Sequence, residues 1–106
     1  MPEEAKQRQN PLTATDSNVR AARDVYFEDC ENCHGKTGKG DGPEAHMHDP
    51  APADLSDPLR MKAISDGELF FKISEGHRPM PAFKRKLTEE QRWQLVLFVR
   101  AFSAKQ

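Results

Sequence analysis

The chain has 106 residues and a formal net charge of −1, with 36% hydrophobic and 31% charged residues. This length indicates one domain with a thin core, in which a bound apolar cofactor would help to fill the interior. The near-neutral charge gives no support for nucleic acid as a partner, and no apolar run approaches the roughly 20 residues of a membrane span.

The first residues, MPEEAKQRQNPLTATD, are polar, contain two prolines and show no hydrophobic period. We therefore expect a flexible N-terminal arm or linker over residues 1–18, followed by one domain over residues 19–106. A tether from a neighbouring domain is the alternative interpretation of this arm. No hydrophobic leader is present, so any export signal is expected to have been removed or to lie outside this sequence.

The first long helix is predicted to begin after Asp16 or Ser17, because both residues are good N-caps. The positions that follow recur at helical spacings of four, four and three residues, and they are Ala22, Tyr26, Cys30 and Cys33. Glycines then end the helix. Residues 35–58 are rich in Gly, Pro, His and Asp, which predicts a long loop with at most one short turn of helix.

Two further helices are predicted from capping boxes. Ser65 and Glu68 open a helix that Gly76 ends, and its inward-facing residues are Leu69, Phe70 and Ile73. Thr88 and Gln91 open a C-terminal helix that runs to about residue 104, with an apolar stripe of Leu95, Phe98, Val99 and Phe102. No segment has the pattern of a strand, so the predicted fold class is all-α.

The only two cysteines, Cys30 and Cys33, stand three residues apart, and His34 follows directly in the sequence CENCHG. Structural zinc needs four ligands, and a second pair drawn from the other three histidines does not fit the usual spacings. Thiol–disulfide exchange normally places such a pair at the start of a helix in a βαβ setting, whereas this pair ends a helix. Covalent attachment of a c-type haem fits best, because the three side chains lie within about 100° on one helical face.

A haem iron bound by His34 needs a second ligand from the opposite side of the ring, and Met80 is the best candidate. Two prolines flank it, which excludes a helix and stiffens the backbone around a weak thioether ligand. Met61 is interpreted as core packing, and Met47 lies in the glycine-rich loop. His77 is a weaker candidate, chiefly as a replacement ligand in alkaline or partly unfolded states. The last two histidines, expected in solvent or at a secondary surface metal site, are His46 and His48.

From about residue 19 to 104 the sequence resembles the class I monohaem c-type cytochromes of bacteria, which have His/Met ligation. The resemblance is carried by six motifs in order: VYFEDCENCHG, GKGDGP, PAPADLSDP, DGELFFKISEG, MPAF and LTEEQRWQLVLFVRAF. It implies the cytochrome c fold, in which three to five short helices wrap around one haem c. The haem would be attached through Cys30 and Cys33, with His34 and Met80 as the iron ligands.

The resemblance also implies contacts around the cofactor. Ala22, where the family often has Gly, and Tyr26 would meet Leu95 and Phe98 where the terminal helices cross. A proline carbonyl would accept a hydrogen bond from the axial histidine, and we expect this proline to be Pro52, with Pro50 as the alternate. The further residues expected to line the haem are Tyr26, Phe70, Ile73, Phe83, Leu87 and Leu95.

These features predict an electron carrier rather than an enzyme, because two axial ligands leave no open iron position for a substrate. An electron-entry domain or subunit of a larger oxidase, dehydrogenase or nitrite reductase is the alternative, and a haem peroxidase or gas sensor is a third. The family's haem attachment outside the cytoplasm implies a periplasmic or extracytoplasmic location, and a monomer is expected. The partners are expected to be redox proteins with an acidic docking surface, steered by the basic residues Lys72, Arg78, Lys84, Arg85 and Lys86. A solvated basic loop without a docking role is the alternative for this segment.

Overall fold

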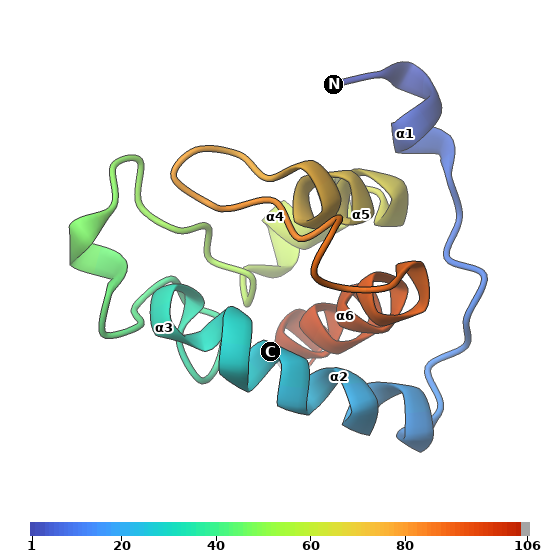
Figure 1. Cartoon of the computed structure of the whole chain (residues 1–106), viewed down its shortest axis with the longest axis horizontal. Coiled ribbons are helices and arrows are strands. Elements are labelled where there is room, and N and C mark those ends of the chain that lie inside the picture. The colour runs from blue at the N-terminus through green and yellow to red at the C-terminus, as the bar shows by residue number, and fades with distance from the viewer. Residues whose placement is uncertain (105–106) are drawn as a thin grey trace.

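The computed structural model describes residues 1–104, so residues 105 and 106 of the expected domain lie outside the described part. Within that part the elements are α1 (Glu3–Gln7), α2 (Asp16–Asp29), α3 (Glu31–His34), the 3-10 helix η1 (Ala45–Met47), α4 (Pro58–Ala63), α5 (Asp66–Glu75) and α6 (Glu89–Ala104) (Figure 1). The all-α class is confirmed. The described residues form six α-helices, one more than the predicted maximum, because the polar N-terminal segment contains α1.

The core lies where α2 and α6 pack together, with α5 beside them (Figure 1). Ala22 and Tyr26 of α2 are buried with Leu95 of α6, and the Tyr26 and Phe98 rings have centroids 5.0 Å apart. This confirms the predicted crossing of the two long helices. α2 begins at Asp16, one or two residues earlier than predicted, because the N-cap is Thr15, whose side chain accepts the capping hydrogen bond.

Both predicted capping boxes lie at helix starts. The Ser65 hydroxyl accepts a hydrogen bond from the Glu68 amide at 3.1 Å, and Gly76 ends α5 with a φ of +76°. At the start of α6 the Thr88 hydroxyl accepts from the Gln91 amide at 3.0 Å, while the Gln91 side chain accepts from the Thr88 amide at 2.8 Å. These caps fix both ends of the loop between α5 and α6.

The N-terminal segment, expected to be a flexible arm or linker, contains the short helix α1. α1 packs against α5 so closely that a side chain at Gly67 would collide with the α1 backbone. The guanidinium of Arg8 lies 4.7 Å from the centre of the Phe70 ring and 5.3 Å from that of Trp93. The segment therefore contacts the core, and the expected domain boundary near residue 19 stays a prediction.

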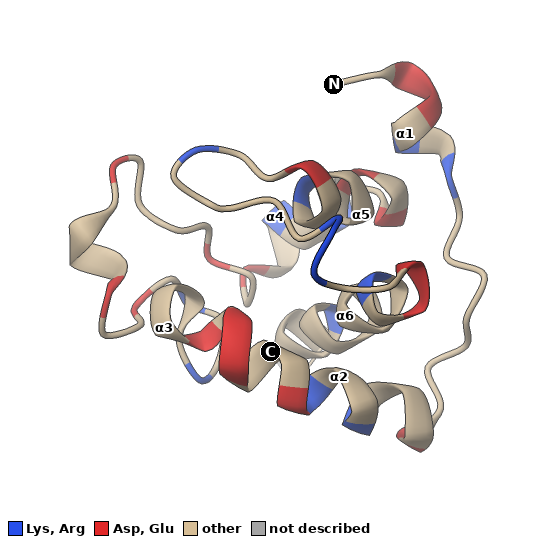
Figure 2. Ribbon diagram, viewed as in Figure 1, with Lys and Arg blue, Asp and Glu red and all other residues tan. Residues whose placement is uncertain are grey.

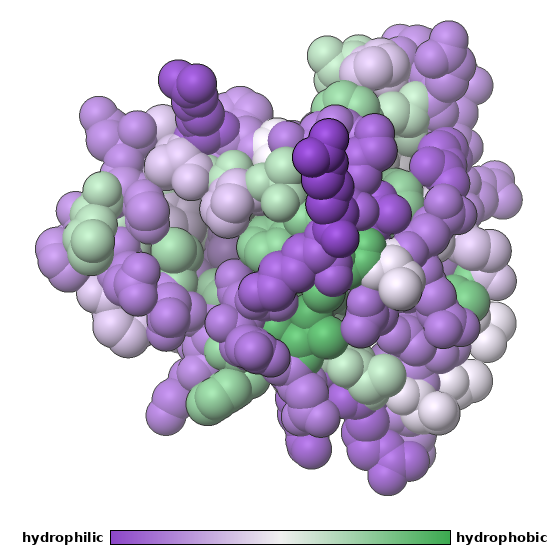
Figure 3. Space-filling view, in the orientation of Figure 1, coloured by the Kyte–Doolittle hydropathy of each residue, from purple (hydrophilic) through white to green (hydrophobic). Residues whose placement is uncertain are grey.

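The surface is largely polar around this core. Figure 3 shows hydrophilic residues over most of one face, with hydrophobic residues gathered near its middle. The large hydrophobic side chains most exposed to solvent include Leu59 at 80%, Phe27 at 66% and Met47 at 66%. No helix within residues 1–104 combines the length and the hydropathy that crossing a membrane would need.

Candidate haem site

A cavity of about 270 Å³ lies between the end of α2, the segment before α4 and the loop that follows α5. Cys30, Cys33 and His34 line it from the short segment at the end of α2 and in α3, and Met80 lines it from the loop between α5 and α6. The structure thus brings the four principal predicted site residues to one space, although Met80 follows His34 by 46 positions in the sequence.

The two cysteines and His34 lie at a break in the helix. α2 ends at Asp29, and the one-turn helix α3 continues the chain, with the His34 amide donating to the Cys30 carbonyl at 3.0 Å. Behind them, the Tyr26 hydroxyl donates to the Gly35 carbonyl at 2.6 Å. This bond ties the residue after His34 back to α2 and holds the motif on one side of the cavity.

The imidazole of His34 is oriented by a backbone carbonyl. Its Nδ1 lies 3.1 Å from the carbonyl oxygen of Ala53. Because a carbonyl only accepts, Nδ1 carries the proton and Nε2 is free to bind a metal. Burial lowers the pKa of His34, although the bond to Ala53 opposes this shift, and the neutral imidazole that a metal requires is favoured.

The predicted acceptor, Pro52, is therefore wrong by one residue, and the alternate Pro50 does not make this bond either. The carbonyl oxygen of Pro52 faces Gly40, where an added Cβ would approach it to 2.6 Å. The next carbonyl along the chain, that of Ala53, is the one within hydrogen-bond distance of His34. Pro52 and Pro50 still line the cavity.

Met80 lies in a loop that closes on itself. The His77 amide donates to the Met80 carbonyl at 3.0 Å, and the Met80 amide donates to the His77 carbonyl at 2.7 Å. Met80 is partly buried, whereas Met61 is only 2% exposed and belongs to the core, as predicted. Met47 is largely exposed and is not among the cavity residues.

The remaining histidines fall in different places. His77 is exposed and lines the cavity, and His46 is exposed as expected. His48 differs from the expectation, since it is half-buried and lines the cavity. One ligand atom each of His48, Cys33 and Glu44 lie within 4.8 Å of one another.

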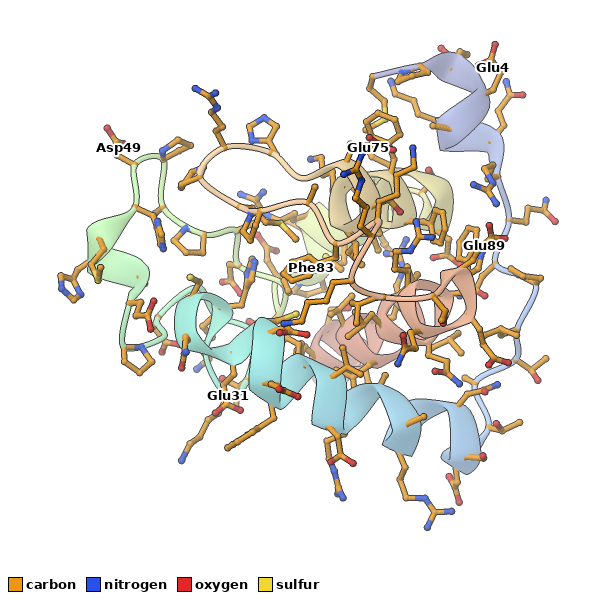
Figure 4. The ribbon with its side chains drawn as sticks, viewed as in Figure 1. Glu4, Glu31, Asp49, Glu75, Phe83 and Glu89 are labelled. Carbon is orange, nitrogen blue, oxygen red and sulfur yellow. The ribbon has the colours of Figure 1, made fainter. Side chains whose placement is uncertain are left out.

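Only one of the apolar residues expected at the haem lines the cavity. This residue is Phe83, which lies in the interior of the molecule (Figure 4) and whose amide donates to the Ile73 carbonyl at 3.0 Å. The other five are buried in the surrounding core or stand behind the cavity wall: Tyr26, Phe70, Ile73, Leu87 and Leu95. These five side chains are therefore not lining residues of the cavity.

Phe70 is the clearest correction among them. Its ring stacks on Trp93, with centroids 4.0 Å apart and an interplanar angle of 16°. It lines a smaller pocket beside α1 and is not among the residues that line the larger cavity. The helical period correctly predicts that Phe70 is buried, but it cannot tell which neighbour lies on the buried side.

The raised pKa values of the Cys30 and Cys33 thiols argue against a role in thiol–disulfide exchange. Burial, reinforced by the adjacent Asp29 carboxylate, raises the pKa of Cys30 to about 12. Burial and Glu44 also raise the pKa of Cys33. Exchange needs a thiolate with a lowered pKa, and neither cysteine has one. Both are instead unpaired thiols at the wall of a cavity, which suits covalent attachment of a cofactor.

Positive charge surrounds this cavity. Arg60, Lys72 and Arg78 line it, and Asp29 is the one acidic residue that does so within the described part of the chain. Figure 2 shows basic residues in the segment before α6, near the acidic end of α2. An anionic group at the mouth would meet a favourable potential.

Comparison with known proteins decides the family. The family described as cytochrome C oxidase, cbb3-type, subunit III matches residues 17–99. The chain belongs to this family. The "Cbb3-type cytochrome c oxidase subunit FixP" of Rhizobium etli is 32% identical over 94 residues, which cover 85% of this chain and 31% of that protein. The chain thus spans about a third of the length of this curated relative.

Solved structures agree with this assignment. A chain of the "Kuenenia stuttgartiensis reducing HAO-like protein complex Kustc0457/Kustc0458" is similar with a TM-score of 0.73 and 27% identity, over 87% of this chain and 46% of the other. The "KustC0563 c-type cytochrome" has a TM-score of 0.68 and 29% identity, over 76% and 95%. The predicted resemblance is confirmed: the chain is an electron-transfer domain of the c-type cytochrome kind, and its family implies covalently bound haem c.

Proposed function

We propose that one haem c is attached to this chain through thioether bonds to Cys30 and Cys33, with His34 and Met80 as its axial ligands. The observation that supports this proposal is the shared cavity, which all four side chains line from two segments far apart in the sequence. The Nδ1–H group of His34 donates a hydrogen bond to the Ala53 carbonyl, so Nε2 is the nitrogen available to iron.

When bound, haem c supplies a one-electron Fe(III)/Fe(II) couple, and methionine ligation raises its reduction potential. The chain's own residues hold and shield this group. Ala53 fixes the orientation of His34, the hydrogen bonds between His77 and Met80 hold the thioether loop, and Phe83 supplies an apolar wall. If His34 and Met80 both bound the iron, no iron position would remain for a substrate, and the protein would transfer electrons rather than transform a substrate.

The partners are proposed to be redox proteins that present an acidic surface to the cavity mouth. Arg60, Lys72 and Arg78 around the cavity support this, because charge complementarity steers transient redox partners. We further propose a periplasmic or other extracytoplasmic location, where c-type haem is attached in this family's bacterial members, and a monomeric carrier.

A role as an electron-entry module of a larger redox assembly is the second candidate. It is favoured by the match to an oxidase subunit family and by a relative about three times as long. Size-exclusion chromatography with haem detection distinguishes the two: a free carrier elutes at the mass of one chain when isolated from its native source. A module would instead co-elute with other redox subunits.

The direct test is a visible absorption spectrum of the purified protein, oxidised and then reduced with dithionite, extended into the far red. We expect sharp reduced bands of low-spin haem and the weak far-red band of Fe(III) bound by methionine. Haem should stay with the polypeptide in acidified acetone, whereas Cys30→Ser with Cys33→Ser should release it. A protein expressed with the haem-attachment machinery that shows no haem bands would overturn the proposal. Rapid binding of carbon monoxide by the reduced protein would favour a gas-binding or peroxidase role instead.

A further inference from the structure

A short ion pair joins the cavity wall to the basic surface. The Lys86 Nζ lies 2.6 Å from Asp29 Oδ1, which links the end of α2 to the segment before α6. The Asp29 side chain is only 8% exposed and lines the cavity directly before Cys30, whereas the Lys86 side chain is 60% exposed. Asp29 thus lies at the cavity, and Lys86 lies at the solvent-exposed surface.

The charges of Asp29 and Lys86 both affect the pKa of Cys30, the first residue of the attachment site. Burial is the largest cause of the raised pKa of Cys30, Asp29 raises it further, and Lys86 opposes that rise. The thiol sulfur of Cys30 is the atom that would be bonded to the haem. A carboxylate this well buried interacts strongly with nearby charge, because water screens it little.

We propose that the Asp29–Lys86 ion pair sets the reduction potential of the haem, and that an acidic partner docked on Lys86 lowers this potential. The inference rests on the proposed function, since it needs haem c in the cavity. Fe(III) carries one more positive charge than Fe(II), so an uncompensated Asp29 carboxylate stabilises the oxidised state. Lys86 cancels this effect while it is paired with Asp29.

Docking changes the balance because Lys86 is accessible. A partner carboxylate competes with Asp29 for the exposed ammonium, and the buried Asp29 carboxylate then acts on the haem without compensation. The docked carrier becomes a stronger reductant. Electron delivery to an acidic acceptor is thereby favoured at the moment of contact, and the free carrier keeps the higher potential.

A neighbouring ion pair provides a matched control. Lys84 pairs with Glu75 at 3.3 Å, but the two side chains are 63% and 43% exposed and neither lines the cavity. Water screens this pair, so Lys84→Met makes the same change in charge two residues from Lys86 without exposing a buried carboxylate.

The test is redox titration of the haem-loaded protein, followed by its visible spectrum, for Lys86→Met, Asp29→Asn, the double variant and Lys84→Met. We expect Lys86→Met to lower the equilibrium constant for reduction about tenfold, which is about 59 mV for a one-electron couple. Asp29→Asn should raise the potential, and adding Lys86→Met to it should have little further effect. Lys84→Met should shift the potential far less than Lys86→Met.

The docking step is tested with poly-L-glutamate at low ionic strength as the acidic probe. It should lower the potential of the unaltered protein, lower that of Asp29→Asn much less, and have no effect in high salt. The inference is overturned if Lys86→Met shifts the potential equally with and without Asp29, or no more than Lys84→Met does. If either of these two results is obtained and the haem bands are present, only the inference about the ion pair fails. If the haem bands are missing, the proposed function itself fails.

Discussion

The hydroxyl of Tyr26 donates a hydrogen bond to the carbonyl oxygen of Gly35 over 2.6 Å, inside the core. Tyr26 lies in α2, before the cysteine pair, and Gly35 follows the motif directly. The bond therefore spans the whole CENCH segment and fixes both of its ends. The aromatic ring of Tyr26 also packs against Phe98 and Phe102 of α6. The crossing of α2 with α6 and the position of His34 therefore both depend on the Tyr26 side chain.

We expect Tyr26→Phe to lower the free energy of unfolding by about 1–3 kcal/mol, because the buried Gly35 carbonyl would lose its donor. The ring contacts with α6 would remain. Urea unfolding, followed by circular dichroism, measures this loss. Phe27→Leu at the exposed neighbouring position is the control and should stay within about 0.5 kcal/mol of the unaltered protein. Equal stability of Tyr26→Phe and the unaltered protein would contradict this role.

The same residue predicts a dependence of stability on pH. Burial raises the pKa of Tyr26 well above its ordinary value. The unfolded chain loses this proton near pH 10, whereas the folded chain keeps it, so its stabilising contribution is full below that pH and declines above it. The stability difference between the unaltered protein and Tyr26→Phe should therefore shrink as pH rises through about 10. A difference that stays constant across this range would exclude the effect.

Alanine variants of Met80 and Met61 should distinguish a methionine that binds the iron from one that only packs in the core. Met80→Ala should remove the far-red band and let the reduced haem bind carbon monoxide, if the proposed ligation is correct. Met61→Ala, at a core position only 2% exposed, should cost about 2–5 kcal/mol in unfolding free energy and leave the far-red band in place. Spectra and urea unfolding of both variants test this. Retention of the far-red band in Met80→Ala would show that another residue binds the iron.

The position of the Ala53 carbonyl, which orients His34, should change when a side chain is added at Gly40. Gly40 has a φ of +83°, and an added Cβ would lie 2.6 Å from the Pro52 carbonyl oxygen. Gly40→Ala should therefore destabilise the fold by about 1–3 kcal/mol and shift the segment that presents the Ala53 carbonyl. The electron paramagnetic resonance spectrum of the oxidised haem reports on the axial ligands and should change.

Pro52→Ala is the matched variant for this prediction. It keeps the backbone carbonyl and removes only the ring, so it should leave the resonance spectrum almost unchanged. If Pro52→Ala altered the spectrum as much as Gly40→Ala does, the ring of Pro52 rather than the carbonyl of Ala53 would control the position of His34.

Local patterns in the sequence predicted local structure well. The capping boxes at Ser65 and Thr88 depend on hydrogen bonds that span three residues, so their residue types alone indicate the helix starts. The CENCH motif likewise brings its three side chains to one cavity, although the helix breaks at Cys30. Met80 could be selected because two prolines excluded a helix around it. Each of these inferences needs only the residue and its close neighbours.

Contacts between distant segments could not be predicted in the same way. A helical stripe shows that Phe70 is buried but not that its partner is Trp93. The family pattern indicates a carbonyl near His34, but the packing of Gly40 on Pro52 decides that Ala53 supplies it. Docking of the polar N-terminal segment depends on one small residue in α5, and no period in that segment signals it.

This N-terminal contact gives the last prediction. Gly67→Ala should displace α1, because the new Cβ would collide with the α1 backbone. The stacking of Arg8 on the Phe70 and Trp93 rings would then be lost, at a cost of about 0.5–2 kcal/mol in unfolding free energy. Limited trypsin digestion should cut faster after Lys6 and Arg8, while the haem spectrum should stay the same because Met80 and His34 lie elsewhere.

Arg8→Ala and Arg23→Ala complete the test of the docked segment. Arg8→Ala should lose a similar amount of stability without a backbone collision, since it removes the cation from both rings. Arg23 lies exposed on α2, so Arg23→Ala makes the same change in charge away from these rings and should leave stability and digestion at Lys6 unchanged. Trypsin cleavage of the unaltered protein as fast as of Gly67→Ala would mean that α1 does not stay on α5 in solution. The N-terminal segment would then act as the flexible arm that its polar composition indicates.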